Sequence, residues 1–288
     1  MDRTSFYEQI NRNKRNSWIL VVSVFMALIF ITVVMSLIIG GVYDSGFMFI
    51  FLIFASIFNI GYVWYTYYKS ADIALKSVNA RPAEGERYRQ LRNIVEELSI
   101  ASGMPKPKVY VMPSPEINAF ATGRDPSHSV VCVTEGCLSQ LNREELQGVL
   151  AHEMTHIRNY DIRFVTLVAS MVGLVSIISQ LYLRSLWFSG GRNRRGGGNA
   201  ALMVAGILLS ILAPIVVKLV QLAISRKREY MADAGAVELT RYPGGLSNAL
   251  RKIEKSYQVR PKTEINSTVA PMFIANPLKG GFKGLFQT

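Results

Sequence analysis

Histidine, cysteine and acidic side chains are scarce in this chain of 288 residues. It has three histidines and two cysteines, and its 20 acidic residues are outnumbered by 32 basic ones, which gives a net charge of +12. This excess of positive charge suits an anionic membrane surface. Nucleic acid is not expected as a partner, because no recognised binding motif accompanies the charge. Cys132 and Cys137 lie in a region expected to be cytosolic, where disulfides are rare, and should be ordinary buried or half-buried thiols.

Charge is missing altogether from long parts of the sequence. Residues 18–42 and 46–68 contain no charged side chain, and each run is longer than the roughly 20 residues that span a bilayer. Only a short turn separates them, which predicts a transmembrane helical hairpin. Residues 164–183 and 196–217 form a second uncharged pair around a loop rich in glycine and arginine. The sequence therefore predicts four transmembrane helices, although buried helices of a soluble domain could resemble the second pair.

Basic residues indicate the orientation of the first hairpin. Arg3, Arg12, Lys14 and Arg15 precede it, its turn has no basic residue, and Lys69 follows it. Because cytoplasmic loops are enriched in lysine and arginine, the N-terminus and the chain from residue 69 onward are expected in the cytosol. The loop of the second hairpin is also basic, although it would face outward, so this prediction depends on the first hairpin.

Two of the three histidines lie in the segment His152-Glu153-Met154-Thr155-His156, which has the pattern H-E-x-x-H. On a helix, residues i and i+4 share one face, so both imidazoles can bind one zinc ion. Glu153 adjoins that face and can take a proton from a water molecule at the metal. The pattern is typical of zinc metallopeptidases, although it also arises by chance on amphipathic helices.

The flanking sequence predicts that this segment is a buried helix. Asn142 and Glu145 have the spacing of an N-terminal capping box. Leucine, valine, methionine and isoleucine side chains between residues 146 and 157 form an apolar face. The two histidines are therefore expected on a well-formed helix inside the protein.

A catalytic zinc ion usually has three protein ligands, so a third candidate is needed. The remaining histidine, His128, lies in a polar stretch typical of a loop and is a poor candidate. Glu229 and Asp233 also share one helix face, so Glu229 could complete a His-His-Glu site and Asp233 could orient a ligating histidine. The same pair could instead be solvated acidic residues within a basic run, and spacing alone does not decide between these readings.

These motifs resemble the HtpX family of integral-membrane zinc endopeptidases, relatives of the CAAX-prenyl-protein endopeptidases. The similarity includes H-E-M-T-H at residues 152–156, S-R-K-R-E-Y-M-A-D at 225–233 and N-A-F-A-T-G at 118–123, and it covers nearly the whole chain. One departure is that family members usually continue past Phe286 into a T-H-P-P segment. No histidine follows His156 here that could stabilise an oxyanion.

The resemblance implies a role for each candidate residue. One zinc ion per chain would be bound by His152, His156 and Glu229, with Glu153 as the general base and Asp233 orienting a ligand. It also implies a mostly α-helical membrane protein with four transmembrane helices and an α+β zincin-like (gluzincin) catalytic domain. Such a protein would lie in the bacterial cytoplasmic (inner) membrane and cleave misfolded membrane proteins in quality control.

The charged parts of the sequence predict the elements of the catalytic domain. Residues 83–103 have a helical pattern and residues 108–112 and 129–134 have strand patterns, which predicts a three-stranded sheet beside the H-E-x-x-H helix. By the resemblance, the stretch 118–122 between them is an exposed edge strand that pairs with extended substrate. The alternative is an internal strand and turn. The residues expected to contact substrate are Asn118, Ala119, Phe120 and Ala121.

Two further helices are expected, over residues 219–240 and 246–257, and the first would carry Glu229 up from the membrane. The expected parts of the chain are the N-terminal region with the first hairpin (1–68), the first catalytic segment (69–162), the second hairpin (163–224) and the second catalytic segment (225–288).

Together these patterns predict a membrane-bound zinc endopeptidase whose partners are membrane-protein or peptide substrates and the lipid bilayer. One rival is a non-catalytic scaffold with structural zinc, but structural sites are closed by a fourth protein ligand and the sequence offers no obvious one. Another is a peptidase of soluble substrates that is merely tethered to the membrane, and the sequence leaves this open.

Overall fold

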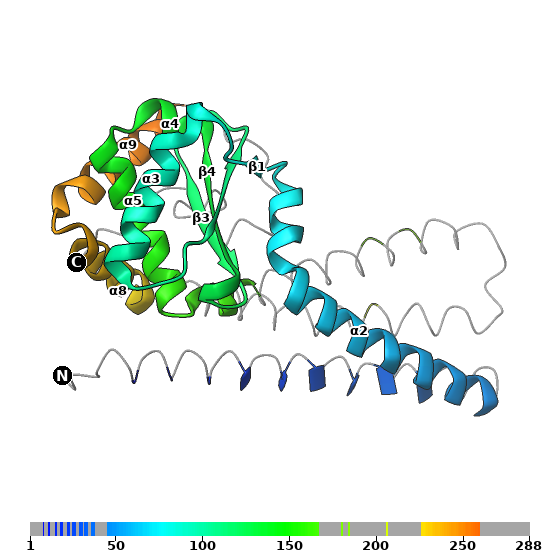
Figure 1. Cartoon of the computed structure of the whole chain (residues 1–288). Coiled ribbons are helices and arrows are strands. Elements are labelled where there is room, and N and C mark those ends of the chain that lie inside the picture. Colours follow the sequence, from blue (N-terminus) through cyan, green and yellow to red (C-terminus); the bar gives the residue numbers. More distant parts are fainter. Residues whose placement is uncertain are drawn as a thin grey trace.

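The computed structural model of the chain describes residues 45–166 and 226–259, together with isolated helical positions elsewhere. The described segments form a mixed sheet with helices on both faces, from which the long helix α2 (Ser45–Ser77) extends (Figure 1). The other helices are η1 (Glu86–Tyr88), α3 (Arg89–Ser102), η2 (Pro126–His128), α4 (Glu135–Gln140), α5 (Arg143–Arg158), α8 (Arg226–Thr240) and α9 (Pro243–Val259).

The sheet has the strand order β1-β2-β4-β3. Its strands are β1 (Arg81–Pro82), β2 (Lys108–Met112), β3 (Ala119–Gly123) and β4 (Ser129–Thr134). β2 and β4 run parallel, β1 pairs antiparallel with β2, and β3 pairs antiparallel with β4. The strands predicted at residues 108–112 and 129–134 are confirmed. The sequence did not predict β1. This strand has only two residues, too few for a strand pattern, and one of them is a proline, which suits the edge of a sheet.

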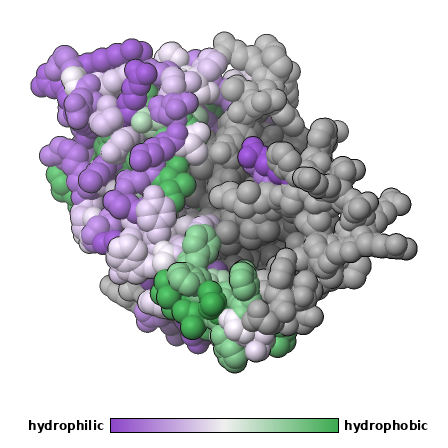
Figure 2. All heavy atoms as spheres, turned by 90° about the vertical axis from the view of Figure 1, so that its right-hand side faces the viewer, coloured by the Kyte–Doolittle hydropathy of each residue, from purple (hydrophilic) through white to green (hydrophobic). Residues whose placement is uncertain are grey.

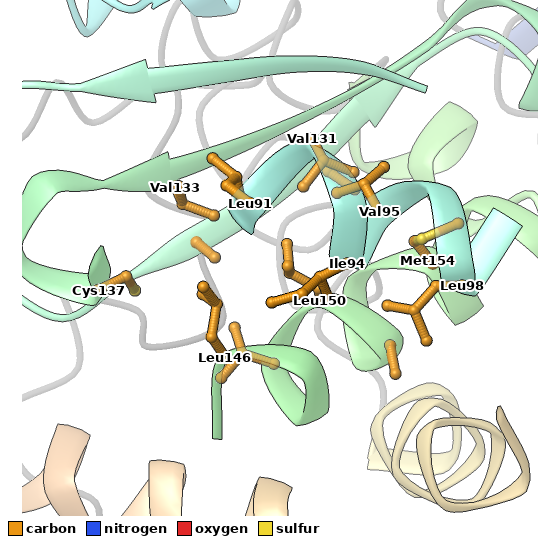
Figure 3. Close-up of a cluster of buried hydrophobic side chains, with 14 of the residues drawn as sticks. Leu91, Ile94, Val95, Leu98, Val131, Val133, Cys137, Leu146, Leu150 and Met154 are labelled. Atoms are coloured by element: carbon orange, nitrogen blue, oxygen red, sulfur yellow. The ribbon is translucent and has the colours of Figure 1, made fainter. Parts of the chain in front are cut away.

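Alternation along the strands separates two apolar cores. The larger core lies between the sheet and helices α3, α5 and α9, and Figure 3 shows Leu91 and Val95 of α3 against Val131 of β4 and Leu150 of α5. Helix α3 ends at the predicted Gly103, whose φ of 66° is the left-handed conformation that favours glycine. The larger core therefore fixes α5, the H-E-x-x-H helix, against the sheet.

The second core lies on the opposite face of the sheet and holds the end of α2. Ala74 and Leu75 are buried there with Phe120 of β3 and Val130 and Cys132 of β4. Both cysteines are buried and unpaired with each other, as expected. The C-terminal end of α2 thus packs on the sheet, and the helix continues through the boundary expected at residue 68.

Among the helices that the structure describes, α2 is the one that is long and apolar enough to cross a membrane. Its phenylalanine and isoleucine side chains face outward, while its buried positions include the polar residues Asn59, Thr66 and Ser70. Asn59 donates a hydrogen bond of 2.7 Å to Thr32 Oγ1 of the first uncharged run. This inversion, with apolar side chains outside and polar ones inside, suits a helix surrounded by lipid. The spans predicted at residues 164–183 and 196–217 lie almost entirely outside the described residues.

Candidate active site

Helix α5 carries both histidines of the H-E-x-x-H motif. It begins with the predicted capping box, in which the Asn142 side chain accepts from Glu145 N at 2.9 Å and the Glu145 carboxylate accepts from Asn142 N at 2.9 Å. Lys252 of α9 also donates to Glu145, at 2.6 Å. Almost every residue from Glu145 to Ile157 is buried. The motif therefore lies on a helix held firmly at its start and packed on several sides.

Small side chains let α8 approach α5 closely. Ala232, Gly235 and Ala236 are the buried residues of α8. A Cβ atom added at Gly235 would lie 2.4 Å from Cγ2 of Thr155, which is much closer than van der Waals contact allows. Glu229 lies about one turn before Ala232, and Asp233 directly follows it. The approach therefore brings both carboxylates to the histidine face of α5.

Three ligand-type side chains converge where α5 meets α8. Nε2 of His152 lies 3.2 Å from Nε2 of His156, and Oε2 of Glu229 lies 3.6 Å and 3.9 Å from these two nitrogens. All three groups fall within 4.8 Å of one another. Tetrahedral zinc with bonds of about 2.0–2.2 Å separates its ligand atoms by about 3.3–3.6 Å. The donor types and their spacing therefore fit a zinc ion with an open fourth position.

Each histidine turns its other ring nitrogen toward a carboxylate. Nδ1 of His152 lies 2.9 Å from Oδ1 of Asp233, although the two groups are not aligned for a hydrogen bond. Nδ1 of His156 lies 3.0 Å from Oδ2 of Asp161 and does form one. Such contacts fix a ligand's tautomer so that Nε2 is free to bind metal. Asp161 was not predicted from the sequence, because it follows the helix and has no helical spacing to the motif.

The carboxylates set the charge of the histidine pair when no metal is bound. Burial lowers the pKa of the His152 imidazole, but Asp233, Glu229 and Glu153 outweigh it and raise this pKa to about 10. Burial likewise raises the pKa of Glu229, but the two imidazoles and Arg228 lower it to about 2. The surrounding carboxylates thus favour positive charge at the two histidines, either as protons on the imidazoles or as a metal cation.

Glu153 lies beside this cluster and contacts the sheet edge. Its side chain is buried, and its carboxylate lies near the backbone N–H of Ala121. Burial raises the pKa of Glu153 above its ordinary value, and the neighbouring imidazoles and the Ala121 N–H oppose this shift in part. A buried carboxylate with a raised pKa is a stronger base than a solvated one, as a proton acceptor in catalysis should be.

Strand β3 forms one edge of the sheet that the described residues build, which is the position expected for it. Asn118 directly precedes β3 and pairs with Thr134. Its N–H donates to Oγ1 of Thr134, and its carbonyl accepts from the Thr134 N–H. Backbone groups alternate along an antiparallel strand, so those of Ala119 and Ala121 point away from β4. There the Ala119 N–H donates to Oδ1 of Asn118 at 3.0 Å. The residues expected to contact substrate are therefore at the edge beside Glu153, although their side chains are buried.

His128 lies apart from the metal-binding group. Its side chain is 55% exposed and its Nδ1 lies 2.8 Å from Oδ1 of Asp125, in the turn that contains η2. The one group of three or more ligand-type residues in the described segments is His152, His156 and Glu229. This agrees with the expectation that His128 is not a ligand.

Known proteins share this sequence over most of its length. Residues 86–288 match the model of Peptidase family M48. The chain is 45% identical to the protease HtpX homolog of Dictyoglomus thermophilum over 99% of this chain and 90% of that protein. It is 50% identical to the homolog of Caldanaerobacter subterraneus subsp. tengcongensis, over 82% of this chain and 80% of that protein. The crystal structure of S. mikatae Ste24p aligns with a TM-score of 0.47 and 20% identity, covering 91% of this chain and 63% of that one. The chain therefore belongs to Peptidase family M48, among the HtpX proteases, and is a metallopeptidase.

Proposed function

We propose that this protein is a zinc endopeptidase that hydrolyses peptide bonds of membrane proteins. The observation that carries this proposal is the convergence of two imidazoles and one carboxylate within 4.8 Å, next to the buried Glu153 and to β3, the outer strand of the sheet that the described residues build. His152, His156 and Glu229 would hold the metal. When bound, zinc supplies a Lewis acid that polarises the scissile carbonyl and activates water.

The other catalytic tasks belong to the chain itself. The edge of β3 aligns an extended substrate by adding it to the sheet as a further strand, with Asn118, Ala119, Phe120 and Ala121 as the contacting segment. The Glu153 carboxylate takes one proton from the attacking water and returns it to the leaving nitrogen, so that an amide and water become a carboxylic acid and an amine. The Ala121 N–H that contacts Glu153 connects the base directly to the substrate edge.

A structural metal is the main alternative use of the same residues. Structural zinc sites have four protein ligands, whereas the described segments supply three. A buried carboxylate beside such a site would also have no function in a purely structural role. Both observations favour catalysis.

The proposed setting is the bacterial cytoplasmic membrane, with four transmembrane helices and the catalytic domain in the cytosol. The domain would consist of residues 69–162 and 225–288, interrupted by the second hairpin. Single cysteines introduced at Ser45 and Ser189 should both react with a membrane-impermeant reagent added outside intact cells. Reaction at Ser45 alone would show that the second hairpin does not cross. Misfolded membrane proteins are the proposed substrates, so a destabilised variant of a test protein should be cut faster than its stable parent.

The decisive experiment compares two glutamate-to-glutamine substitutions on one helix, α5. Glu153→Gln should keep one zinc ion per chain, by elemental analysis, and lose about 10²–10⁴-fold or more in cleavage rate, which is typical for loss of a general base. Glu144→Gln is the matched control, because Glu144 is exposed in the first turn of α5. Undiminished cleavage by Glu153→Gln would overturn the assignment.

A further inference from the structure

The exposed side chains of α2 change character sharply after Tyr68. Before that point they are apolar or aromatic and include Trp64 and Tyr65, while Lys69 and Asp72 follow. Tryptophan and tyrosine gather where a membrane meets water. Figure 2 shows the apolar surface separate from the hydrophilic surface of the catalytic domain. The bilayer boundary therefore lies near Tyr68.

Strand β3 ends at this boundary. Arg124 follows the strand, and its guanidinium lies 4.7 Å from the centre of the Tyr68 ring. Phe120, at the other end of β3, packs with Ala74 and Leu75 near the end of α2. The strand and the last turns of α2 therefore run in opposite directions, and β3 points toward the bilayer.

Two other boundaries in the sequence meet at the same place. Arg163 is the last charged residue before the uncharged run 164–183, and its Nε donates to the Arg124 carbonyl at 2.8 Å. Arg228 is the third residue after the uncharged residues 219–225, and its guanidinium lies 4.5 Å from the centre of the Phe164 ring. Three transitions from uncharged to charged sequence thus surround the end of β3, as one membrane plane would require.

The catalytic groups lie close to that plane. Ala121, whose N–H contacts Glu153, is three residues from Arg124, which corresponds to about 10 Å along an extended strand. Glu229, which completes the metal-binding group, is adjacent to Arg228. The site is therefore on the order of 10 Å outside the bilayer boundary.

We propose that this distance selects the bond that is cut: the protease cleaves about three to five extended residues beyond a membrane-spanning segment of its substrate. The packing of α2 against the sheet holds the distance constant, because Ala74 and Leu75 are buried against the strand that aligns substrate. The substrate class is a membrane-anchored chain whose first residues outside the bilayer are unfolded. This inference rests on the proposed function and adds a rule for where cleavage occurs.

A repeated sequence separates distance from sequence preference. The full-length protease is reconstituted in liposomes with a test protein that has one spanning segment followed, on the protease side, by three copies of a polar seven-residue unit. The distance rule predicts one main cut, in the first copy, by mass spectrometry of the products. Three residues inserted before the first copy should move the cut three positions toward the start of the unit, as far as its junction with the insertion. Cuts at the same bond of all three copies would overturn the rule and leave the proposed function intact.

The same repeats without a spanning segment provide the control. A free peptide has no fixed distance to the boundary, so its cuts should spread over the three copies. If the free peptide is cut in a Glu153-dependent way and the anchored one is not, the proposed membrane-protein substrates are wrong, and the distance rule with them. Arg124→Ala removes the contact with Tyr68 and should spread the cuts of the anchored substrate over neighbouring bonds. Arg143→Ala, which removes only the exposed ion pair with Glu97, should leave the cut in place.

Discussion

Nδ1 of His156 lies 3.0 Å from Oδ2 of Asp161, five residues further along the chain. Asp161 is almost completely buried and stands at the start of the helical residues 161–166. The contact turns Nε2 of His156 toward His152 and Glu229. It also stabilises the imidazole dipole in the tautomer that a metal needs.

Asp161→Asn should therefore weaken zinc binding by about 10–100-fold, which is typical for loss of a carboxylate that orients a ligand. The substitution keeps the shape of the side chain and removes its charge. Competition with a chromogenic chelator measures the affinity without depending on catalysis. Asp125→Asn is the matched control, because Asp125 contacts the exposed His128 instead of a histidine of the site. Equal affinities for the two variants would show that Asp161 does not act through His156.

The sequence predicted the parts of the site that depend on helix geometry. The pairs His152/His156 and Glu229/Asp233 each follow the i, i+4 rule, which is local and needs no knowledge of the fold. Asp161 could not be found in this way, because Tyr160 before it has a φ of 61° and lies in a turn that interrupts the helix. The direction of a side chain after such a turn depends on the final packing.

The closeness of α5 and α8 was also beyond prediction from the sequence. Gly235 is an ordinary helical glycine until the partner helix is known, and only the structure shows Thr155 against it. The contact of Arg124 with Tyr68 likewise joins segments that share no local pattern. Long-range docking, in contrast to the helices and strands themselves, therefore had to come from the structure.

Glu229→Ala and Asp233→Ala should differ in their effect on zinc. Glu229 faces both histidine Nε2 atoms, so its loss removes a ligand and should leave the purified protein largely free of metal. Asp233 contacts only Nδ1 of His152, the nitrogen that faces away from the metal position. Its loss should therefore lower the affinity for zinc more mildly, by about 10–100-fold. Elemental analysis after dialysis ranks the two variants. His128→Ala is the control, and depletion of zinc in that variant but not in Glu229→Ala would refute the ligand set.

Gly235→Ala should push α8 away from α5 and reduce zinc occupancy. The new methyl group would lie 2.4 Å from Cγ2 and 2.7 Å from Oγ1 of Thr155. Thr155 cannot easily turn aside, because it is buried and donates to the Ala151 carbonyl at 2.9 Å. Helix propensity alone would favour alanine over glycine by about 1 kcal/mol, so a loss of zinc must come from the clash.

A second substitution tests this explanation. Thr155→Ala removes the two nearest atoms that the new methyl group meets and leaves only the end of the flexible Arg158 side chain, at 3.1 Å. The double variant should therefore recover zinc relative to Gly235→Ala alone. Gly61→Ala is the control for adding a methyl group, because a Cβ atom there would meet nothing within 4 Å apart from its chain neighbours and the helix's own backbone. Independent, additive losses in the double variant would contradict the clash.

The metal-free protein should be most stable between about pH 4.5 and 6.5, the ordinary pKa values of Glu229 and His152. The pKa of His152 is raised to about 10 in the folded protein, so its contribution to stability is complete below its ordinary value of 6.5. That contribution is lost as the pH rises through 10. The pKa of Glu229 is lowered to about 2, so its contribution is present above 4.5 and lost as the pH falls through 2.

Zinc should reverse the alkaline half of this profile, because it binds the unprotonated imidazoles and competes with their protons. The difference in Tm between the zinc-loaded and the chelator-treated protein should therefore widen from pH 6 to pH 9. The Glu153→Gln variant in detergent suits this measurement, since it should not digest itself. A Glu229→Ala variant of the same protein serves as the control and should show little dependence of Tm on zinc at either pH. A constant difference between the two forms from pH 6 to pH 9 would mean that protons and zinc do not compete for these histidines.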